Sequence, residues 1–251
     1  MCITICKIIH VTTKKAPGYG RCLFPKFQHG GSYEQYYKNN VKVNTQTEYT
    51  FKFLSNELLD TRCIFVIRDK EYYSDDWHGT LDKECGGVLI NQAIHTVDLI
   101  QYFGGKCISL DAHVSNDSLK DVIEVEDTAT VRMKLENGVT AVLYATTAYS
   151  ENSDVFIEIL TEKGKLRLEG EKLFVFDENK NMTEIHCDSE IVYHGESYWG
   201  SGHSALINDF YDCVRSGKKF EIDAFEGGHA AKIVAASYLS AQKNQAVTID
   251  L

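Results

Sequence analysis

Between residues 108 and 188 the chain divides into short segments, several of which alternate apolar with polar residues. This alternation is typical of β-strands that have one face against a core and a more polar opposite face. Turn residues separate the segments, and Asn137-Gly138 is the strongest hairpin signal in the chain. The segments are ISLDAHV, TATVRMKLE, VTAVLYATTA, DVFIEILTE, GKLRLE, KLFVFDE and MTEIHCD. We therefore predict an α+β fold, with an open, mainly antiparallel β-sheet and helices packed on one face.

Helical spacing is found on both sides of these segments. In the stretch Trp77–Gly105, apolar residues that follow Gly86-Gly87 recur at helical intervals and predict an amphipathic helix of about four turns. Two closing helices are predicted in SGHSALINDFYDCVRSG and GGHAAKIVAASYLSAQKN, followed by a final strand AVTIDL. Residues Thr47–Leu59 also suit a helix, and Cys63–Arg68 has the β-branched composition of a buried strand.

Length and charge limit the function. A chain of 251 residues with 43% apolar residues is long enough for one large domain or two small ones. Its net charge of −10 argues against nucleic acid and against an anionic membrane surface, so a small molecule is the expected partner. Eight cysteines without a C-x-x-C pair indicate reduced thiols and no metal site, and no apolar run is long enough to span a membrane. We expect a cytoplasmic protein.

Three polar side chains share one stripe of the predicted helix that follows Gly87. Asn91, His95 and Asp98 lie at positions i, i+4 and i+7. An imidazole has an ordinary pKa near 6.5 and suits acid-base chemistry at neutral pH, and the two neighbours could orient it. The alternatives are a structural histidine and a carboxylate that caps or bridges to a nearby loop.

The loop before this helix combines arginine with aromatic residues. Aromatic rings stack on the apolar faces of sugars, and a guanidinium donates paired hydrogen bonds. The loop residues with these properties are Arg68, Tyr72, Tyr73 and Trp77. They predict a pocket for a sugar or polyol, although aromatic residues could also simply close the edge of the core.

Several motifs in residues 64–251 are specific when taken together. They are R-D-x-x-Y-Y, W-x-G-T, GG-x-L-x-N-Q-A-I-H-x-x-D-L and Y-W-G-S-G-H-x-x-x-I-x-D-F-Y. In this combination the chain resembles the C-terminal, substrate-binding and oligomerisation domain of the Gfo/Idh/MocA oxidoreductases. The resemblance implies an NAD(P)-dependent sugar or polyol dehydrogenase in which His95 takes the hydroxyl proton as hydride leaves for nicotinamide. It also places His203 near the active cleft, and it assigns Asn91 to a position where several members carry aspartate.

In that family a Rossmann domain that binds NAD or NADP precedes this region. No strand with a G-x-G-x-x-G turn occurs before residue 60, so we expect the cofactor domain to be largely missing and cofactor binding by this chain alone to be doubtful. The expected organisation is a divergent segment, 1–45, which could be a Rossmann remnant, and the α/β domain, 46–251. The resemblance also suggests a homo-oligomer through the sheet face, and a separate Rossmann subunit could complete the site. The alternatives are a non-catalytic dimerisation or sugar-binding module and a truncated gene product.

Overall fold

The computed structural model describes residues 41–44, 48–51, 58–136, 138–161, 164–170, 172–185 and 203–250. The strands of its main sheet are β3 (Leu58–Phe65), β4 (Cys107–Ser115), β5 (Thr128–Leu135), β6 (Thr140–Thr146), β7 (Phe156–Thr161), β8 (Gly164–Glu169), β9 (Lys172–Phe176), β10 (Met182–Ile185) and β11 (Val247–Thr248). The helices in the described residues are α3 (Ile94–Gly104), α4 (His203–Ser216) and α5 (Ala224–Lys243). A separate pair consists of β1 (Val41–Asn44) and β2 (Glu48–Phe51).

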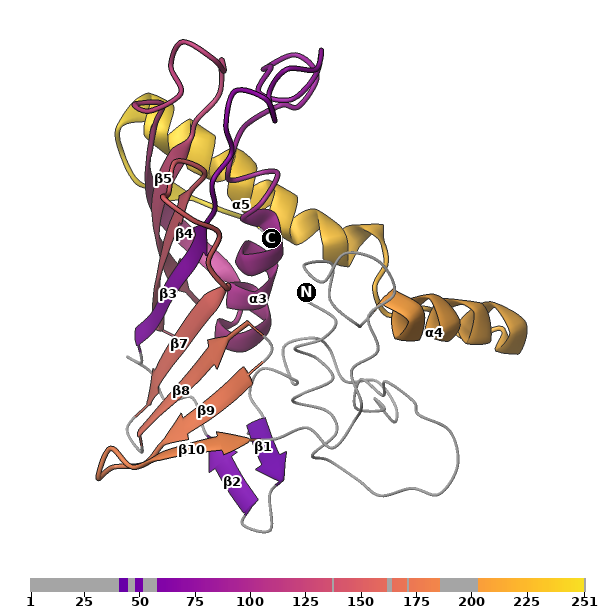
Figure 1. Ribbon diagram of the computed structural model, residues 1–251. Helices are drawn as coiled ribbons and strands as arrows, with labels where there is room; N and C mark the ends of the chain where they lie inside the picture. Colours follow the sequence, from indigo (N-terminus) through magenta and orange to yellow (C-terminus); the bar gives the residue numbers. More distant parts are fainter. Residues whose placement is uncertain are drawn as a thin grey trace.

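The main sheet has nine strands in the order β10-β9-β8-β7-β3-β6-β5-β4-β11. Within it only β3 and β6 pair in parallel, and every other neighbouring pair is antiparallel. Helices α3 and α5 lie on the same face of the sheet (Figure 1). The predicted α+β class, with an open and mainly antiparallel sheet covered by helices on one face, is therefore confirmed.

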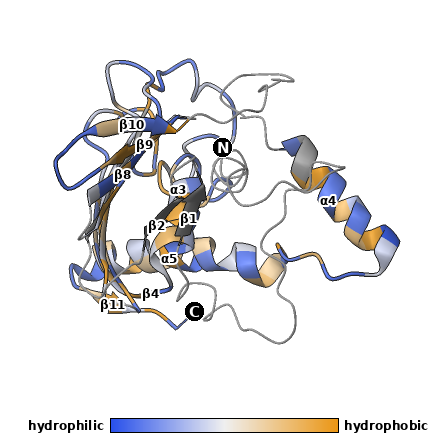
Figure 2. Cartoon of the chain, turned by 90° about the horizontal axis from the view of Figure 1, so that it is seen from below, coloured by the Kyte–Doolittle hydropathy of each residue, from blue (hydrophilic) through white to orange (hydrophobic). Residues whose placement is uncertain are grey.

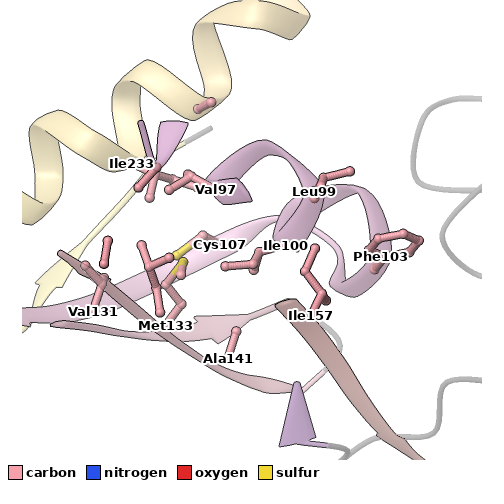
Figure 3. Close-up of a cluster of buried hydrophobic side chains, with 14 of the residues drawn as sticks. Val97, Leu99, Ile100, Phe103, Cys107, Val131, Met133, Ala141, Ile157 and Ile233 are labelled. Carbon is pink, nitrogen blue, oxygen red and sulfur yellow. The ribbon is translucent and has the colours of Figure 1, made fainter. Parts of the chain in front are cut away.

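The alternating segments place one face of each strand in the core. In β5 the side chains of Ala129, Val131, Met133 and Leu135 are buried and those between them are exposed. These buried side chains meet apolar residues of the two helices, as Figure 3 shows for Val131 and Met133 beside Val97 and Ile233. Because the period of a strand is two, a slip of one residue in register would expose this whole set.

The hairpin between β5 and β6 forms where Asn137-Gly138 predicts it. Asn137 itself lies outside the described residues, but Gly138 has a φ of +85°, a conformation that glycine adopts without a steric penalty. Its N–H donates to the carbonyl of Leu135 at 3.0 Å, and the Leu135 N–H donates to the carbonyl of Val139 at 2.9 Å. The turn thus sets the register of the two strands.

The predicted helix Thr47–Leu59 is wrong in the part that the structure describes. Residues 48–51 form strand β2, and β3 begins at Leu58, earlier than the expected start at Cys63. Apolar spacing alone does not separate a helix from a strand in a short stretch, and here pairing with β6 and β7 decides the conformation. The division of the chain at residue 45 stays a prediction, because apart from β1 the first 45 residues lie outside the described part.

Helix α4 stands away from the sheet at one end of α5 (Figures 1 and 2). We predicted helices packed on one face of the sheet, but apolar side chains of α4 are largely exposed: Ile207 is 53% exposed, Phe210 44% and Val214 62%. By contrast, the stripe of α5 lies in the core, with Ile233 and Val234 buried. Helical periodicity therefore predicted both helices but did not show which of them packs on the sheet.

Candidate functional site

Helix α3 is shorter than its sequence predicts, because the turns after Gly87 are irregular. The Asn91 N–H donates to the carbonyl of Gly87 at 3.0 Å, whereas the N–H groups of Gln92 and Ala93 both donate to the carbonyl of Val88, at 3.2 and 2.8 Å. Regular helix begins only at Ile94. The expected single stripe is thus divided: Asn91 lies in the irregular turns, and His95 and Asp98 lie on the helix.

The apolar side of α3 is anchored in the core. Val97, Leu99, Ile100 and Phe103 are buried members of the core cluster, and Figure 3 shows Val97 beside Ile233 of α5. The opposite side carries His95, which is exposed, and Asp98, which is half-buried. The helix therefore holds its polar stripe on a rigid support.

The protein lowers the pKa of His95. Desolvation of the ring by neighbouring protein atoms is the main cause, because it disfavours the charged imidazolium even though the residue keeps an exposed surface. The carboxylate of Asp98 acts in the opposite direction, and the charge of His203 lowers the pKa further. His95 therefore carries a neutral imidazole, able to accept a proton, over a wider pH range than an ordinary histidine does.

The aromatic loop after β3 is a connected cluster. The guanidinium of Arg68 lies 4.8 Å from the ring centroid of Tyr72, and the Tyr72 ring meets Tyr73 edge to face at 4.9 Å. Tyr72 also contacts His78 at 4.5 Å, and His78 lies against Trp77 at 3.5 Å between ring centroids. The four loop residues that the sequence singles out are brought together, and the structure adds His78.

The His78 ring is held by a neighbouring carboxylate. Asp75 Oδ2 lies 2.6 Å from His78 Nδ1, while Asp75 Oδ1 accepts the N–H groups of Trp77 and His78 at 3.3 and 2.9 Å. These hydrogen bonds lower the pKa of Asp75 against the opposing effect of desolvation. Sequence reasoning missed this pair, although an aspartate three residues before a histidine is a local signal that could have indicated it.

Glu84 connects the aromatic loop to the irregular turns before α3. Its Oε1 accepts a hydrogen bond from Asn91 Nδ2, and its Oε2 accepts the N–H of Gly79 at 2.5 Å. Asn91, predicted as a site residue, is therefore tied to the loop that follows Trp77. No sequence signal indicated Glu84, because its partners lie five and seven residues away across a loop.

Other site predictions are less constrained. His203 is exposed and is the first residue of α4, and its charge lowers the pKa of His95. Within the same part of the chain, no three metal-ligating side chains lie together. No described helix has the length and apolar character needed to cross a membrane.

The chain is similar over much of its length to known oxidoreductases. A family model described as the C-terminal alpha/beta domain of the oxidoreductase family (Gfo/Idh/MocA) matches residues 58–249. D-apiose dehydrogenase of Paraburkholderia graminis is 24% identical over 170 residues, which cover 64% of this chain and 44% of that protein.

Solved structures agree with the family match. The WlbA dehydrogenase of Bordetella pertussis, solved with NADH and UDP-GlcNAcA, has a TM-score of 0.61 and 25% identity, covering 77% of this chain and 54% of that chain. Levoglucosan dehydrogenase, solved with NADH and levoglucosan, has a TM-score of 0.66 and 18% identity, covering 79% and 60%, and supports the fold alone. The chain thus spans about half the length of the relatives it matches. The family match, over most of the chain, shows that it belongs to the Gfo/Idh/MocA oxidoreductases, with residues 58–249 corresponding to their C-terminal α/β domain.

Proposed function

We propose that this chain supplies the substrate-binding half of an NAD(P)-dependent sugar or polyol dehydrogenase, with His95 as the proton-transfer residue. The observation that carries the proposal is the bridge made by Glu84, which ties the loop bearing Trp77 to Asn91 just before α3. A ring that can stack on a sugar and an amide that can bind its hydroxyl group are thereby held in one framework.

The loop cluster supports a polyhydroxylated substrate. The Trp77 side chain is 43% exposed, so its ring remains accessible although it lies against His78. Arg68 and Tyr72 lie in the same cluster and offer hydrogen-bond donors. The relatives named above act on or bind D-apiose, levoglucosan and UDP-GlcNAcA, which are all sugars or sugar derivatives.

His95 suits the role of a base. Oxidation of a CH–OH group to a carbonyl releases a hydride, which NAD or NADP accepts, and a proton, which an imidazole nitrogen of His95 would accept. The lowered pKa of His95 keeps this imidazole neutral at pH 7, and Asp98 stabilises the imidazolium that forms. The carbonyl oxygen of the Asn91 amide can accept a hydrogen bond from a substrate hydroxyl, while its Nδ2 donates to Glu84.

The described residues do not fit a dinucleotide site. Such a site needs parallel strands joined through a glycine-rich turn and a helix. The parallel pair in the described sheet is β3 and β6, and β3 leads into the aromatic loop instead of such a turn. We therefore propose that a Rossmann domain outside the described residues holds NAD or NADP, and a separate subunit could supply it.

Two measurements test the proposal. Titration of levoglucosan or D-apiose into the full chain, followed by NMR, should perturb the Trp77 indole. Trp77→Ala should weaken binding at least tenfold, whereas Phe225→Ala, which removes an exposed aromatic ring from α5, should not.

With a Rossmann domain and NAD added, His95→Ala should lower the turnover rate by about 10² to 10⁴. Full activity of that variant would remove His95 from the mechanism.

A second candidate function is association through the uncovered sheet face. On β7–β9 this face carries Glu158, which pairs with Lys165 at 2.8 Å and Arg167 at 3.1 Å, and the two cations lie over the ring of Phe176. Paired charges beside an aromatic ring suit a protein–protein contact better than the polar outer face of β5 does. Light scattering after size exclusion should therefore give a homodimer, and a monomer at micromolar concentration would contradict this candidate.

A further inference from the structure

One residue accepts hydrogen bonds from three successive backbone amides at the start of the candidate site. Glu126 Oε2 accepts the N–H of Gly87 at 3.0 Å, its own carbonyl oxygen accepts the N–H of Val88 at 3.2 Å, and its Oε1 accepts the N–H of Leu89 at 3.0 Å. The Glu126 residue is only 6% exposed. A buried carboxylate with such partners fixes the position of the backbone that it binds.

These amides belong to the irregular turns that carry Asn91 and lead into α3. Buried backbone N–H groups that have no partner in a regular helix or strand need one from elsewhere. Glu126 supplies these partners for Gly87, Val88 and Leu89, so a residue far along the chain holds the turns before α3.

Glu126 and Tyr238 lie so close to the turns before α3 that Gly86 and Gly87 have no space for side chains. A Cβ atom at Gly87 would lie 2.0 Å from the Glu126 carbonyl oxygen, and one at Gly86 would lie 2.1 Å from Tyr238 Oη. Tyr238 reaches from α5 and donates its hydroxyl to Glu126 Oε1 at 2.8 Å. The Gly-Gly pair is therefore explained by the close approach of Glu126 and Tyr238.

Residues 124–126 also hold the aromatic loop, through Glu124. The Glu124 N–H donates to the carbonyl of Gly79 at 2.8 Å, and Glu124 Oε2 accepts the N–H of Leu81 at 3.0 Å. Residues 124–126, which lead into β5, thus contact both parts of the site: the loop that follows Trp77 and the turns before α3.

We infer that Glu126 is a positioning residue for proton transfer, which sets the location of Asn91 and His95 by binding the amides of Gly87, Val88 and Leu89. The inference rests on the proposed function. Glu126 needs no contact with substrate in this role, because it acts through the backbone of residues 87–89. Its carboxylate is required because a glutamine amide would turn an NH₂ group toward one of three donors, namely Gly87 N–H, Leu89 N–H or the Tyr238 hydroxyl.

The test compares Glu126→Gln with Asp127→Asn. Asp127 is the matched control because it is fully buried, adjacent, and accepts two backbone amides, from Ser118 and Leu119 at 2.8 and 3.0 Å, away from α3. Both variants should lose stability to urea. Only Glu126→Gln should change the NMR titration of His95, which is assigned among the nine histidines by comparison with His95→Gln.

We expect the pKa of His95 to rise toward the ordinary value of about 6.5 in Glu126→Gln, because a loosened helix exposes the ring. In the assay with a Rossmann domain, NAD and levoglucosan, kcat should fall about 10- to 100-fold in this variant, with KM within about twofold. Asp127→Asn should leave kcat, KM and the His95 titration unchanged. Equal effects of the two variants on His95 would overturn the inference.

A failure of the proposed function can be distinguished from a failure of this inference. If wild-type protein shows no turnover with any polyol, the proposed dehydrogenase fails. The His95 titration still reports whether Glu126 positions α3. Conversely, turnover with wild-type protein together with an unchanged His95 titration in Glu126→Gln overturns only the positioning role.

Discussion

Two helices of this domain start in different ways. Helix α5 is capped by its own chain, since Asp223 Oδ1 accepts the N–H groups of Phe225 and Glu226 at 3.0 and 3.1 Å. The irregular turns that lead into α3 have a distant cap instead, because their amides donate to Glu126, which lies 37 residues after Leu89. The first cap is local and half-buried, whereas the second is buried and connects the turns before α3 to a strand and to α5.

The difference shows what each cap can control. A local cap stabilises the helix that it begins but leaves the placement of that helix to side-chain packing. A distant cap also fixes the helix relative to the rest of the fold. Such a connection suits a helix that carries candidate site residues, because their position relative to a substrate must be held within a fraction of an ångström.

The largest effect should come from filling the space between Gly87 and Glu126. Gly87→Ala places a Cβ 2.0 Å from a backbone carbonyl oxygen that cannot move without displacing β5, so we expect a loss of about 3 kcal/mol or more in unfolding free energy. Gly227→Ala in α5 is the control, because nothing lies within 4 Å of its Cβ, and alanine there should stabilise the helix by up to about 1 kcal/mol. Urea unfolding measures both. Similar losses in the two variants would show that the α3 segment is not held tightly.

Tyr238→Phe should have a smaller effect. The variant removes one hydrogen bond to the buried Glu126 carboxylate and leaves the packing of the ring intact. A hydrogen bond to a charged group contributes about 1.5 to 3 kcal/mol, and we expect the lower end of this range because two amides still bind the same carboxylate. Thermal unfolding provides the measurement. A loss as large as that of Gly87→Ala would mean that Tyr238, and not Glu126, organises the segment.

Patterns of short range predicted much of the fold. The alternation in TATVRMKLE located β5, and Asn137-Gly138 located its hairpin, because strand periodicity and turn conformation are properties of a few adjacent residues. The helix predicted at Thr47–Leu59 was wrong because β3 takes its conformation from β6 and β7. Its parallel pairing with β6 had no local signal.

The candidate site shows the same contrast between local sequence signals and long-range contacts. Arg68, Tyr72 and Trp77 were predicted from residue type and position in a loop, and the structure places them in one cluster. Glu84 and Glu126 were not predicted, because a glutamate in a loop or before a strand is ordinary and only the folded chain reveals which amides it binds. Residues that could contact a substrate were thus easier to identify than residues that hold them in place.

The two caps should respond to pH with opposite signs. Hydrogen bonds from Lys219 and the Glu226 amide lower the pKa of Asp223, so the stability that Asp223 contributes is present above the unfolded-state value near 3.9 and lost as pH falls further. Burial raises the pKa of Glu126 above its unfolded value near 4.3, so the folded state binds the proton more tightly and stability falls as pH rises through the folded-state pKa. Urea unfolding from pH 3 to 8 measures both dependences. The dependence due to Asp223 should disappear in Asp223→Asn, and the dependence due to Glu126 should disappear in Glu126→Gln. A Glu126 dependence with the sign of Asp223 would show that its hydrogen bonds outweigh its burial.

The smallest effect should come from the local cap. Asp223→Ala leaves the N–H groups of Phe225 and Glu226 to water, since both residues lie at the accessible start of α5. We expect faster hydrogen exchange at these amides and at Gly227, whose N–H donates to the carbonyl of Asp223 at 3.0 Å. Exchange at buried positions of α5 such as Ile233 should be unchanged, because the core and not the cap holds them. If Asp223→Ala instead accelerated exchange through all of α5, the start of this helix would be as strongly coupled to the fold as the turns held by Glu126, and the contrast between local and distant capping would not hold.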